Sequence, residues 1–253
     1  MLTRVQIQRL AQRHNMGVQA QERDYIQYLL LMLLYSRSQS LLFKGGTALR
    51  IVHRTGRYSE DLDFNGTIDT DEIKDLWGGL LDELRGFGIN AEIRNEWRAE
   101  VGYSFDVSYQ GPLYDGRDRT KGKVRVDISL RHEEVDTERE LVSSEYDDVR
   151  PFVATVLTRE HLVAEKVRAL LMRGKARDVY DLWLLSNQGV SIQPELVSRK
   201  LSISNVTLSR ASLNDALDQA GKDWERDLRP LLPQFVSWED ILKQIQPILD
   251  RLI

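Results

Sequence analysis

The residue types best suited to chemistry fall in two short segments near the start of the chain. An apolar run at residues 41–43 stops at Lys44, Gly45 and Gly46, which predicts a buried strand that ends in a tight turn. We expect Thr47 to cap a helix over residues 48–53. Such a turn exposes backbone N–H groups at the positive end of a helix dipole, so this segment suits a phosphate group.

The second segment carries acidic side chains. Asp61 and Asp63 alternate with Leu62 and Phe64, so in a strand both carboxylates leave one face while the apolar side chains enter the core. Adjacent carboxylates repel unless a cation lies between them, and hard oxygen ligands suit Mg²⁺, which commonly also binds a substrate phosphate. Either segment alone is also typical of a plain turn or a solvated strand face. Together they predict transfer of a nucleotidyl or phosphoryl group.

Further along the chain, two more positions could take part. Residues 123–131 alternate apolar and polar side chains, which places Asp127 on the polar face of a half-buried strand. Lys166 lies inside the apolar stripe of a helix that begins at Thr158. A lysine there must either extend its ammonium to solvent or meet an anion, and beside a triphosphate it would neutralise phosphate charge.

Two aspartates, Asp178 and Asp181, lie one turn apart at the start of the next predicted helix. They could cap that helix, because carboxylates are favourable near a helix N-terminus. Alternatively, one of them could hold Lys166 or Arg177 in place.

The segment Lys44-Gly45-Gly46-Thr47-x-Leu49-Arg50, followed by Ser59-Glu60-Asp61-Leu62-Asp63-Phe64, resembles the first motif of the AbiEii-type nucleotidyltransferase toxins. These toxins belong to the polymerase-beta-like superfamily of minimal nucleotidyltransferases. The resemblance implies that Asp61, Asp63 and Asp127 hold Mg²⁺ in a two-metal site. It also implies that an NTP is bound by Lys44, Gly45, Gly46, Thr47, Arg50, Ser59 and Lys166.

Two later segments extend the resemblance. Residues 165–173 resemble the third motif of the family, in which the lysine, here Lys166, contacts the nucleotide phosphates. Residues 177–181 resemble the fourth motif, which contains an aspartate essential for activity. The sequence does not decide between Asp178 and Asp181 for that role.

Composition narrows the remaining classes of site. The chain of 253 residues has no cysteine, so disulfides and cysteine-based zinc sites are excluded. The formal net charge of −4 argues against a general nucleic-acid coat, although it permits a local basic patch. The most apolar run, residues 26–35, is too short to span a bilayer, and the first residues lack the core of a signal peptide. We therefore expect a cytoplasmic protein with no membrane segment.

These patterns predict an α+β fold in two parts. Residues 1–155 form a mixed-sheet nucleotidyltransferase core with a cap of N-terminal helices, and residues 156–253 form a helical domain that completes the active site. Within the core, residues 132–148 are acidic and irregular, which predicts an exposed connection. The strand predicted over residues 101–109 carries alternate apolar side chains from Val101 to Tyr109.

The predicted activity is Mg²⁺-dependent transfer of a nucleoside monophosphate to an acceptor hydroxyl. The resemblance implies a toxin with a cognate antitoxin, a role in abortive infection and phage defence, and the 3′ end of tRNA as acceptor. The polar, basic loop at residues 111–123 favours such a large anionic acceptor. Two alternatives remain: a nucleotidyltransferase that modifies a small molecule such as an antibiotic, and a catalytically silent module that binds a protein.

Overall fold

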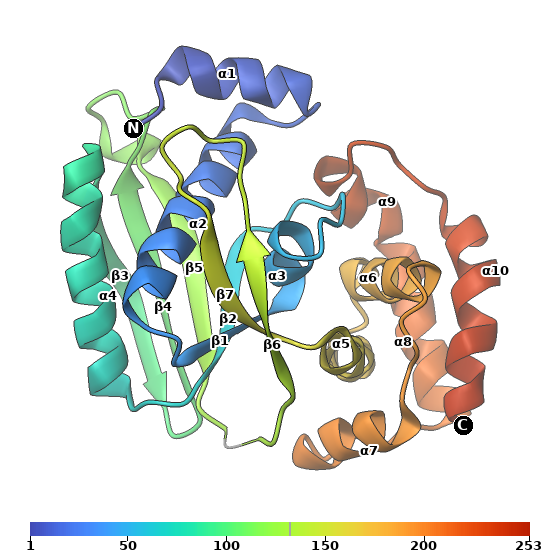
Figure 1. Ribbon diagram of the computed structural model, residues 1–253. Coiled ribbons are helices and arrows are strands. Elements are labelled where there is room, and N and C mark those ends of the chain that lie inside the picture. Colours follow the sequence, from blue (N-terminus) through green and yellow to red (C-terminus); the bar gives the residue numbers. More distant parts are fainter. Residues whose placement is uncertain (132) are drawn as a thin grey trace. The chain divides into compact units, whose positions relative to one another are not determined.

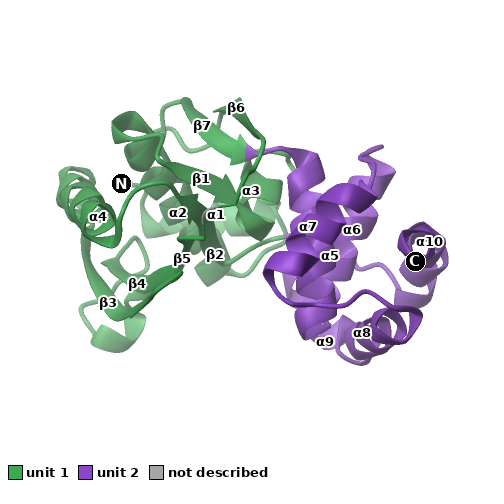
Figure 2. Ribbon diagram, turned by 90° about the horizontal axis from the view of Figure 1, so that it is seen from below, with its two compact units in different colours: residues 1–54, 58–156 green, residues 55–57, 157–253 purple. Residues whose placement is uncertain are grey.

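The computed structural model describes residues 1–131 and 133–253, which divide into two compact units (Figure 2). The first unit comprises Met1–Arg54 and Tyr58–Val156, and the second comprises Thr55–Arg57 and Leu157–Ile253. The segment Thr55–Arg57 therefore belongs with the second unit, although the sequence places it in the first part of the chain.

The first unit is built on a mixed sheet. Its helices are α1 (Arg4–Arg13), α2 (Val18–Arg37), α3 (Gly45–Ile51) and α4 (Thr70–Leu84), with short 3-10 turns η1 (Arg85–Phe87) and η2 (Asp118–Thr120). Its strands are β1 (Leu41–Lys44), β2 (Asp61–Gly66), β3 (Asn90–Ala99), β4 (Gly102–Gln110), β5 (Gly122–Ser129), β6 (Thr137–Val142) and β7 (Phe152–Leu157). They form one seven-stranded sheet in the order β3-β4-β5-β2-β1-β7-β6 (Figure 1). This arrangement confirms the predicted α+β class.

The two faces of this sheet differ because side chains alternate along each strand. Phe64 of β2 and Phe105 of β4 both pack against the indole ring of Trp77 on α4, with ring centroids 6.5 Å and 5.1 Å from it. Helix α2, which is buried along most of its length, also contacts this face through β5 (Figure 1). The apolar face is thus the core, and the opposite face carries the polar side chains of β2, β4 and β5.

Three features differ from the sequence-based expectations. Residues 132–148, predicted to be irregular, contain the edge strand β6, whose side chains are mostly exposed or half-buried. His132, the first residue of that stretch, lies outside the described residues. Val101 is 43% exposed in the turn before β4, and β4 is buried without interruption from Tyr103 to Val107, because Ser104 and Asp106 are buried as well. Helix α3 begins at Gly45 with Lys44 as its N-cap, so Thr47 lies within the helix and does not cap it.

The second unit is helical. Its helices are α5 (Arg159–Arg173), α6 (Ala176–Asn187), α7 (Pro194–Ile203), α8 (Arg210–Lys222), α9 (Trp224–Leu228) and α10 (Trp238–Leu249), with 3-10 turns η3 (Arg229–Leu231) and η4 (Asp250–Leu252). Helices α5 and α6 contact each other, and α5 also contacts α7 and α8. Gly174 ends α5 in the left-handed conformation, as the sequence predicts for a glycine after a helix. Over residues 1–131 and 133–253, no helix has the length and apolarity needed to cross a membrane.

Candidate active site

The three predicted metal-binding aspartates lie on adjacent strands of the first unit. Asp61 and Asp63 are two residues apart on β2, so their side chains leave the same face of the sheet. Strand β5 runs parallel to β2, and in this register Asp127 is the direct partner of Asp63. All three side chains belong to half-buried residues. The structure therefore brings all three predicted carboxylates to one face of two paired strands.

The glycine turn lies against this face. Gly45 has a φ of +76°, which favours glycine, and a Cβ added there would come within 2.7 Å of Cγ of Asp63. The hydroxyl of Thr47, inside α3, donates a hydrogen bond to the backbone carbonyl of Asp61. The backbone of the turn thus packs directly against the carboxylate of Asp63, and Thr47 ties α3 to the start of β2.

The other predicted nucleotide-binding residues lie around this turn. Lys44 is the register partner of Asp63 on the antiparallel strand β1. Ser59 is nearly buried just before β2, and its carbonyl accepts a hydrogen bond from Nε2 of Gln27. Arg50 is differently placed, because its Nε donates to Oδ1 of Asp24 at 2.6 Å and its side chain is only 18% exposed. Arg50 therefore stabilises the contact between α3 and α2.

A polar pocket of about 520 Å³ adjoins Asp61. It is lined by Arg23, Glu60, Asp61, Asp106, Lys123 and Arg125. A second pocket of about 330 Å³ shares Asp106 and Lys123 with the first. Each pocket is lined by three basic and three acidic side chains, so neither lining carries a net charge. Polar ligands with both charged and hydrogen-bonding groups would fit such a lining.

Asp127 has a basic neighbour that the sequence motifs do not indicate. Nε of Arg125 lies 3.3 Å from Oδ1 of Asp127, and NH2 of Arg125 donates to Oγ of Ser104 at 2.5 Å. NH1 of the same guanidinium lies 3.5 Å from Oδ1 of the buried Asp106. Arg125 and Asp127 are two residues apart on β5, so they share one strand face. Asp106 lies directly opposite Arg125, so the contact between these two depends on the register of β4 and β5.

The carboxylates of Asp61, Asp63 and Asp127 are suited in type to a divalent cation. Carboxylate oxygens on one strand face are the hard ligands that Mg²⁺ prefers. Within residues 1–131 and 133–253, however, no three His, Cys, Asp or Glu side chains already converge as metal ligands. The Asp127 carboxylate contacts Arg125, and the three carboxylates do not converge on one position. The residues fit Mg²⁺ in type and register, and binding would require their carboxylates to turn toward one another.

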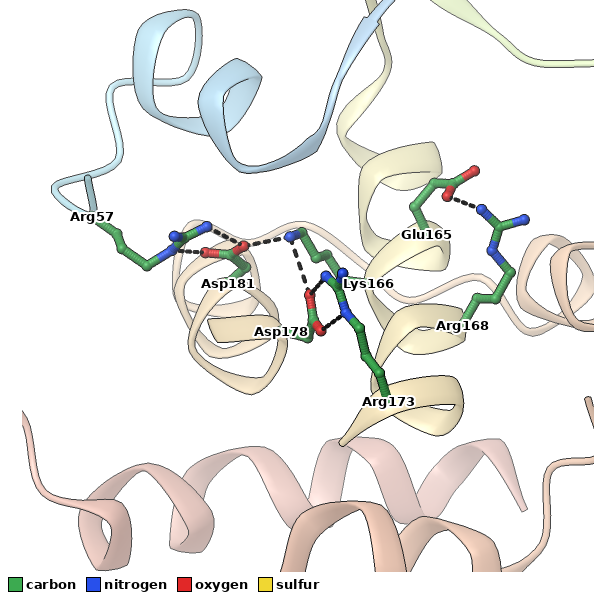
Figure 3. Close-up of polar contacts among 7 residues, drawn as sticks. All are labelled: Arg57, Glu165, Lys166, Arg168, Arg173, Asp178 and Asp181. Carbon is green, nitrogen blue, oxygen red and sulfur yellow. Dashed lines mark hydrogen bonds and ion pairs between the residues drawn. The ribbon is translucent and has the colours of Figure 1, made fainter. Parts of the chain in front are cut away.

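The remaining predicted residues form a buried ionic cluster in the second unit (Figure 3). Nζ of Lys166 on α5 lies 2.7 Å from Oδ2 of Asp181 and 3.3 Å from Oδ1 of Asp178, both on α6. Arg173 donates to both oxygens of Asp178, and Arg57 donates to both oxygens of Asp181. Arg57 is a member that no motif indicated, because it is distant in the sequence from α5 and α6.

The pKa values of the two aspartates show which form is present. Burial by itself would raise the pKa of Asp181, but the guanidinium of Arg57 and the ammonium of Lys166 outweigh it and hold the pKa below its usual range. Burial likewise opposes ionisation of Asp178, and Lys166 and Arg173 lower its pKa. Both aspartates are therefore carboxylates at neutral pH.

The family model for the nucleotidyl transferase AbiEii toxin of type IV toxin–antitoxin systems matches residues 32–244. The chain belongs to the AbiEii family. It is accordingly a nucleotidyltransferase toxin, which confirms the predicted enzyme class. This assignment favours an enzyme over a catalytically silent binding module. The matched residues reach into α10, so the C-terminal helices belong to the family domain. A toxin of this type implies an antitoxin partner.

Solved structures of similar proteins agree with this assignment at the level of the fold. The chain is similar to MenT4, a nucleotidyltransferase toxin from Mycobacterium tuberculosis H37Rv, with 21% sequence identity, a TM-score of 0.71 and coverage of 99% of this chain and 90% of MenT4. It is also similar to JHP933 from Helicobacter pylori, with 19% identity, a TM-score of 0.63 and coverage of 94% and 93%. No curated protein has a sequence that matches the chain closely enough to count as a relative.

Proposed function

We propose that the chain transfers a nucleoside monophosphate from an NTP to the 3′ end of tRNA and releases pyrophosphate. The proposed setting is the bacterial cytoplasm during phage defence, where the modified tRNA would stop translation. The observation that supports this reaction most directly is the in-register pair Asp63 and Asp127 beside the glycine turn. Carboxylates and a close backbone approach on one strand face suit the positioning of a triphosphate.

Residues of the first unit would bind the metal, bind the triphosphate and orient the acceptor hydroxyl. Asp61, Asp63 and Asp127 would hold Mg²⁺, which when bound would neutralise charge on the triphosphate and polarise the reacting oxygens. Lys44 and Ser59, with the two glycines between them, would bind the triphosphate, as the family resemblance implies. Asp127 would accept a hydrogen bond from the acceptor hydroxyl and orient it for in-line attack.

Bond changes follow from the class of reaction. The acceptor oxygen forms a bond to the α-phosphorus while the bond from that phosphorus to the bridging oxygen breaks. The electron pair leaves with pyrophosphate, and the hydroxyl proton passes to a base, which we assign to the carboxylate of Asp127. In the second unit, Lys166 would present a fixed ammonium to an anionic phosphate oxygen.

A labelling assay tests the proposal. Purified protein with Mg²⁺ and each α-labelled NTP is incubated with total tRNA, with protein extract, with an aminoglycoside, or alone. An Asp63→Asn variant serves as the inactive control. Label on tRNA that disappears in the control would support the proposal and identify the nucleotide. Label on the small molecule would support the alternative acceptor, and transfer that persists in Asp63→Asn would contradict the assigned carboxylates.

A further inference from the structure

Arg57 is an unusual arginine because it is almost completely buried. It lies in the loop between α3 and β2, four residues before Asp61, and its side chain is 2% exposed. Its Nε and NH2 donate to the two carboxylate oxygens of Asp181 at 2.7 Å and 2.9 Å. A bidentate pair of this kind fixes the plane and direction of the carboxylate more firmly than a single hydrogen bond does.

Asp181 passes this constraint to Lys166. Its Oδ2 accepts from Arg57 and also lies 2.7 Å from Nζ of Lys166 (Figure 3). Since Arg57 sets the position of that oxygen, it also sets the point at which the ammonium is held. On the other side of the ammonium, Asp178 is oriented in the same way by its bidentate pair with Arg173.

The arrangement argues against a direct chemical role for the two aspartates. Every carboxylate oxygen of Asp178 and Asp181 already accepts from a cationic donor within the cluster. Arg57 and Lys166 also hold the pKa of Asp181 low despite its burial, so this carboxylate is a poor base at neutral pH. A metal ion at either aspartate would also be repelled by the cations that already surround both carboxylates.

Lys166 keeps the capacity to bind an anion. Its ammonium carries three N–H donors, and the two aspartates engage two of them. A phosphate oxygen could accept the third.

We propose that Arg57 is a positioning residue for Lys166. Arg57 orients Asp181, and Asp181 and Asp178 together hold the Lys166 ammonium for one anionic phosphate group of the nucleotide. This inference rests on the proposed function, because it assumes that Lys166 binds a phosphate. It assigns both aspartates the role of holding the lysine, so neither acts as base or metal ligand.

A double-mutant cycle tests this chain of contacts. The kcat and the KM for NTP are measured for wild type, Arg57→Gln, Lys166→Met and the double variant, at a temperature at which melting curves show all four folded. We expect Arg57→Gln to lower kcat/KM by about a hundredfold, the loss that a misplaced group commonly causes. We expect the double variant to be no worse than Lys166→Met, since Arg57 acts through Lys166. Multiplicative losses, or an Arg57→Gln variant as active as wild type, would overturn the proposal.

Two further variants separate positioning from folding. Arg57→Lys keeps a cation beside Asp181 but loses the bidentate geometry, so it should fold and recover part of the lost kcat/KM; full activity in this variant would refute the positioning role. Arg168→Gln is the matched control, because Arg168 is also an arginine of this unit that is mostly shielded from solvent and forms an ion pair, with Glu165. Its kcat/KM should stay within about twofold of wild type.

A binding measurement distinguishes failure of this inference from failure of the proposed function. Inorganic tripolyphosphate is titrated into wild type, Arg57→Lys and Lys166→Met by calorimetry. If wild type transfers no nucleotide to any acceptor, the proposed function fails, yet weaker tripolyphosphate binding in both variants would still support the positioning of Lys166. Equal binding by all three proteins, or no binding by wild type, would overturn it.

Discussion

Asp63 of β2 and Asp127 of β5 are direct partners in a parallel pair of strands. Their side chains leave the same face of the sheet, and Gly45 approaches the carboxylate of Asp63 so closely that no side chain would fit between them. Strand register therefore brings these two residues together, and the glycine turn packs against the carboxylate of Asp63.

Replacing Asp63 or Asp127 by Asn should remove activity without unfolding the protein. We expect kcat to fall by about 10²- to 10³-fold, which is typical of losing one charged group that stabilises the transition state. The melting temperature should change little, because Asn keeps the size of the side chain. In Asp127→Asn, the relief of repulsion between like charges offsets the loss of the contact with Arg125. Asp71→Asn is the matched control, since Asp71 is an exposed aspartate on α4 that pairs with Arg98. Loss of activity in this control would show that activity depends on the net charge of the protein and not on these particular carboxylates.

Gly45→Ala should impair both stability and transfer. The positive φ of Gly45 would cost about 1–2 kcal/mol with any side chain, and the added Cβ would displace the carboxylate of Asp63. Gly78→Ala is the control, because Gly78 lies in α4 and an added Cβ meets nothing within 4 Å. In a helix interior this change should stabilise the protein by about 1 kcal/mol and leave kcat unchanged. Urea unfolding and the labelling assay measure the two effects.

The ionic cluster of the second unit should make folding sensitive to acid. The pKa values of Asp178 and Asp181 are lowered in the folded state, so their contribution to stability is present above their ordinary pKa of 3.8. That contribution is lost as the pH falls below 3.8 toward the lower folded values. Melting temperatures measured from pH 7 to pH 2 should therefore drop most steeply below pH 4. An Asp178→Asn variant should melt lower at pH 7 and show a shallower drop, and an unchanged slope would contradict this account.

Removing the carboxylate of Asp181 should be among the most destabilising changes in the helical unit. Asp181→Ala leaves the guanidinium of Arg57 buried without its bidentate partner, and breaking such a pair costs about 3–5 kcal/mol. Asp223→Ala removes an aspartate that pairs with the exposed Arg226 and should cost less than about 1 kcal/mol. Urea unfolding of both variants compares the two losses, and similar values would indicate that the buried pair is not a major source of stability.

Lys123→Ala should affect the acceptor more than the nucleotide. Lys123 lines the pocket that adjoins Asp61 and also the second pocket, and its side chain is 60% exposed. Its Nζ lies 3.5 Å from Oδ2 of Asp106. If the acceptor is RNA, the KM of this variant for RNA should rise several-fold and depend less on salt concentration, because one contact with a phosphate is lost. The KM for NTP should not change. Lys74→Ala, which removes an exposed lysine on α4, is the control.

The linear order of side chains was sufficient to predict that one strand face carries the three carboxylates. Alternation along β2 and β5 predicted that Asp61, Asp63 and Asp127 would each leave a polar strand face, because side-chain direction in a strand has a period of two residues. The glycine turn and the lysine inside an apolar helical stripe were found in the same local way. The family resemblance rested on these segments, and the α+β class and the enzyme class were confirmed.

Contacts between segments distant in the sequence could not be predicted in this way. The pairing of Arg57 with Asp181 joins residues 124 positions apart, and the contact of Arg50 with Asp24 joins residues 26 positions apart. No local pattern encodes either partner, since both depend on which helix packs beside which loop. The contact of Arg125 with Asp106 could not be predicted for the same reason, because it arises only through the pairing of β4 with β5. Local periodicity therefore specified which strand face each candidate side chain leaves, whereas the packing of distant segments specified which distant charges lie near it.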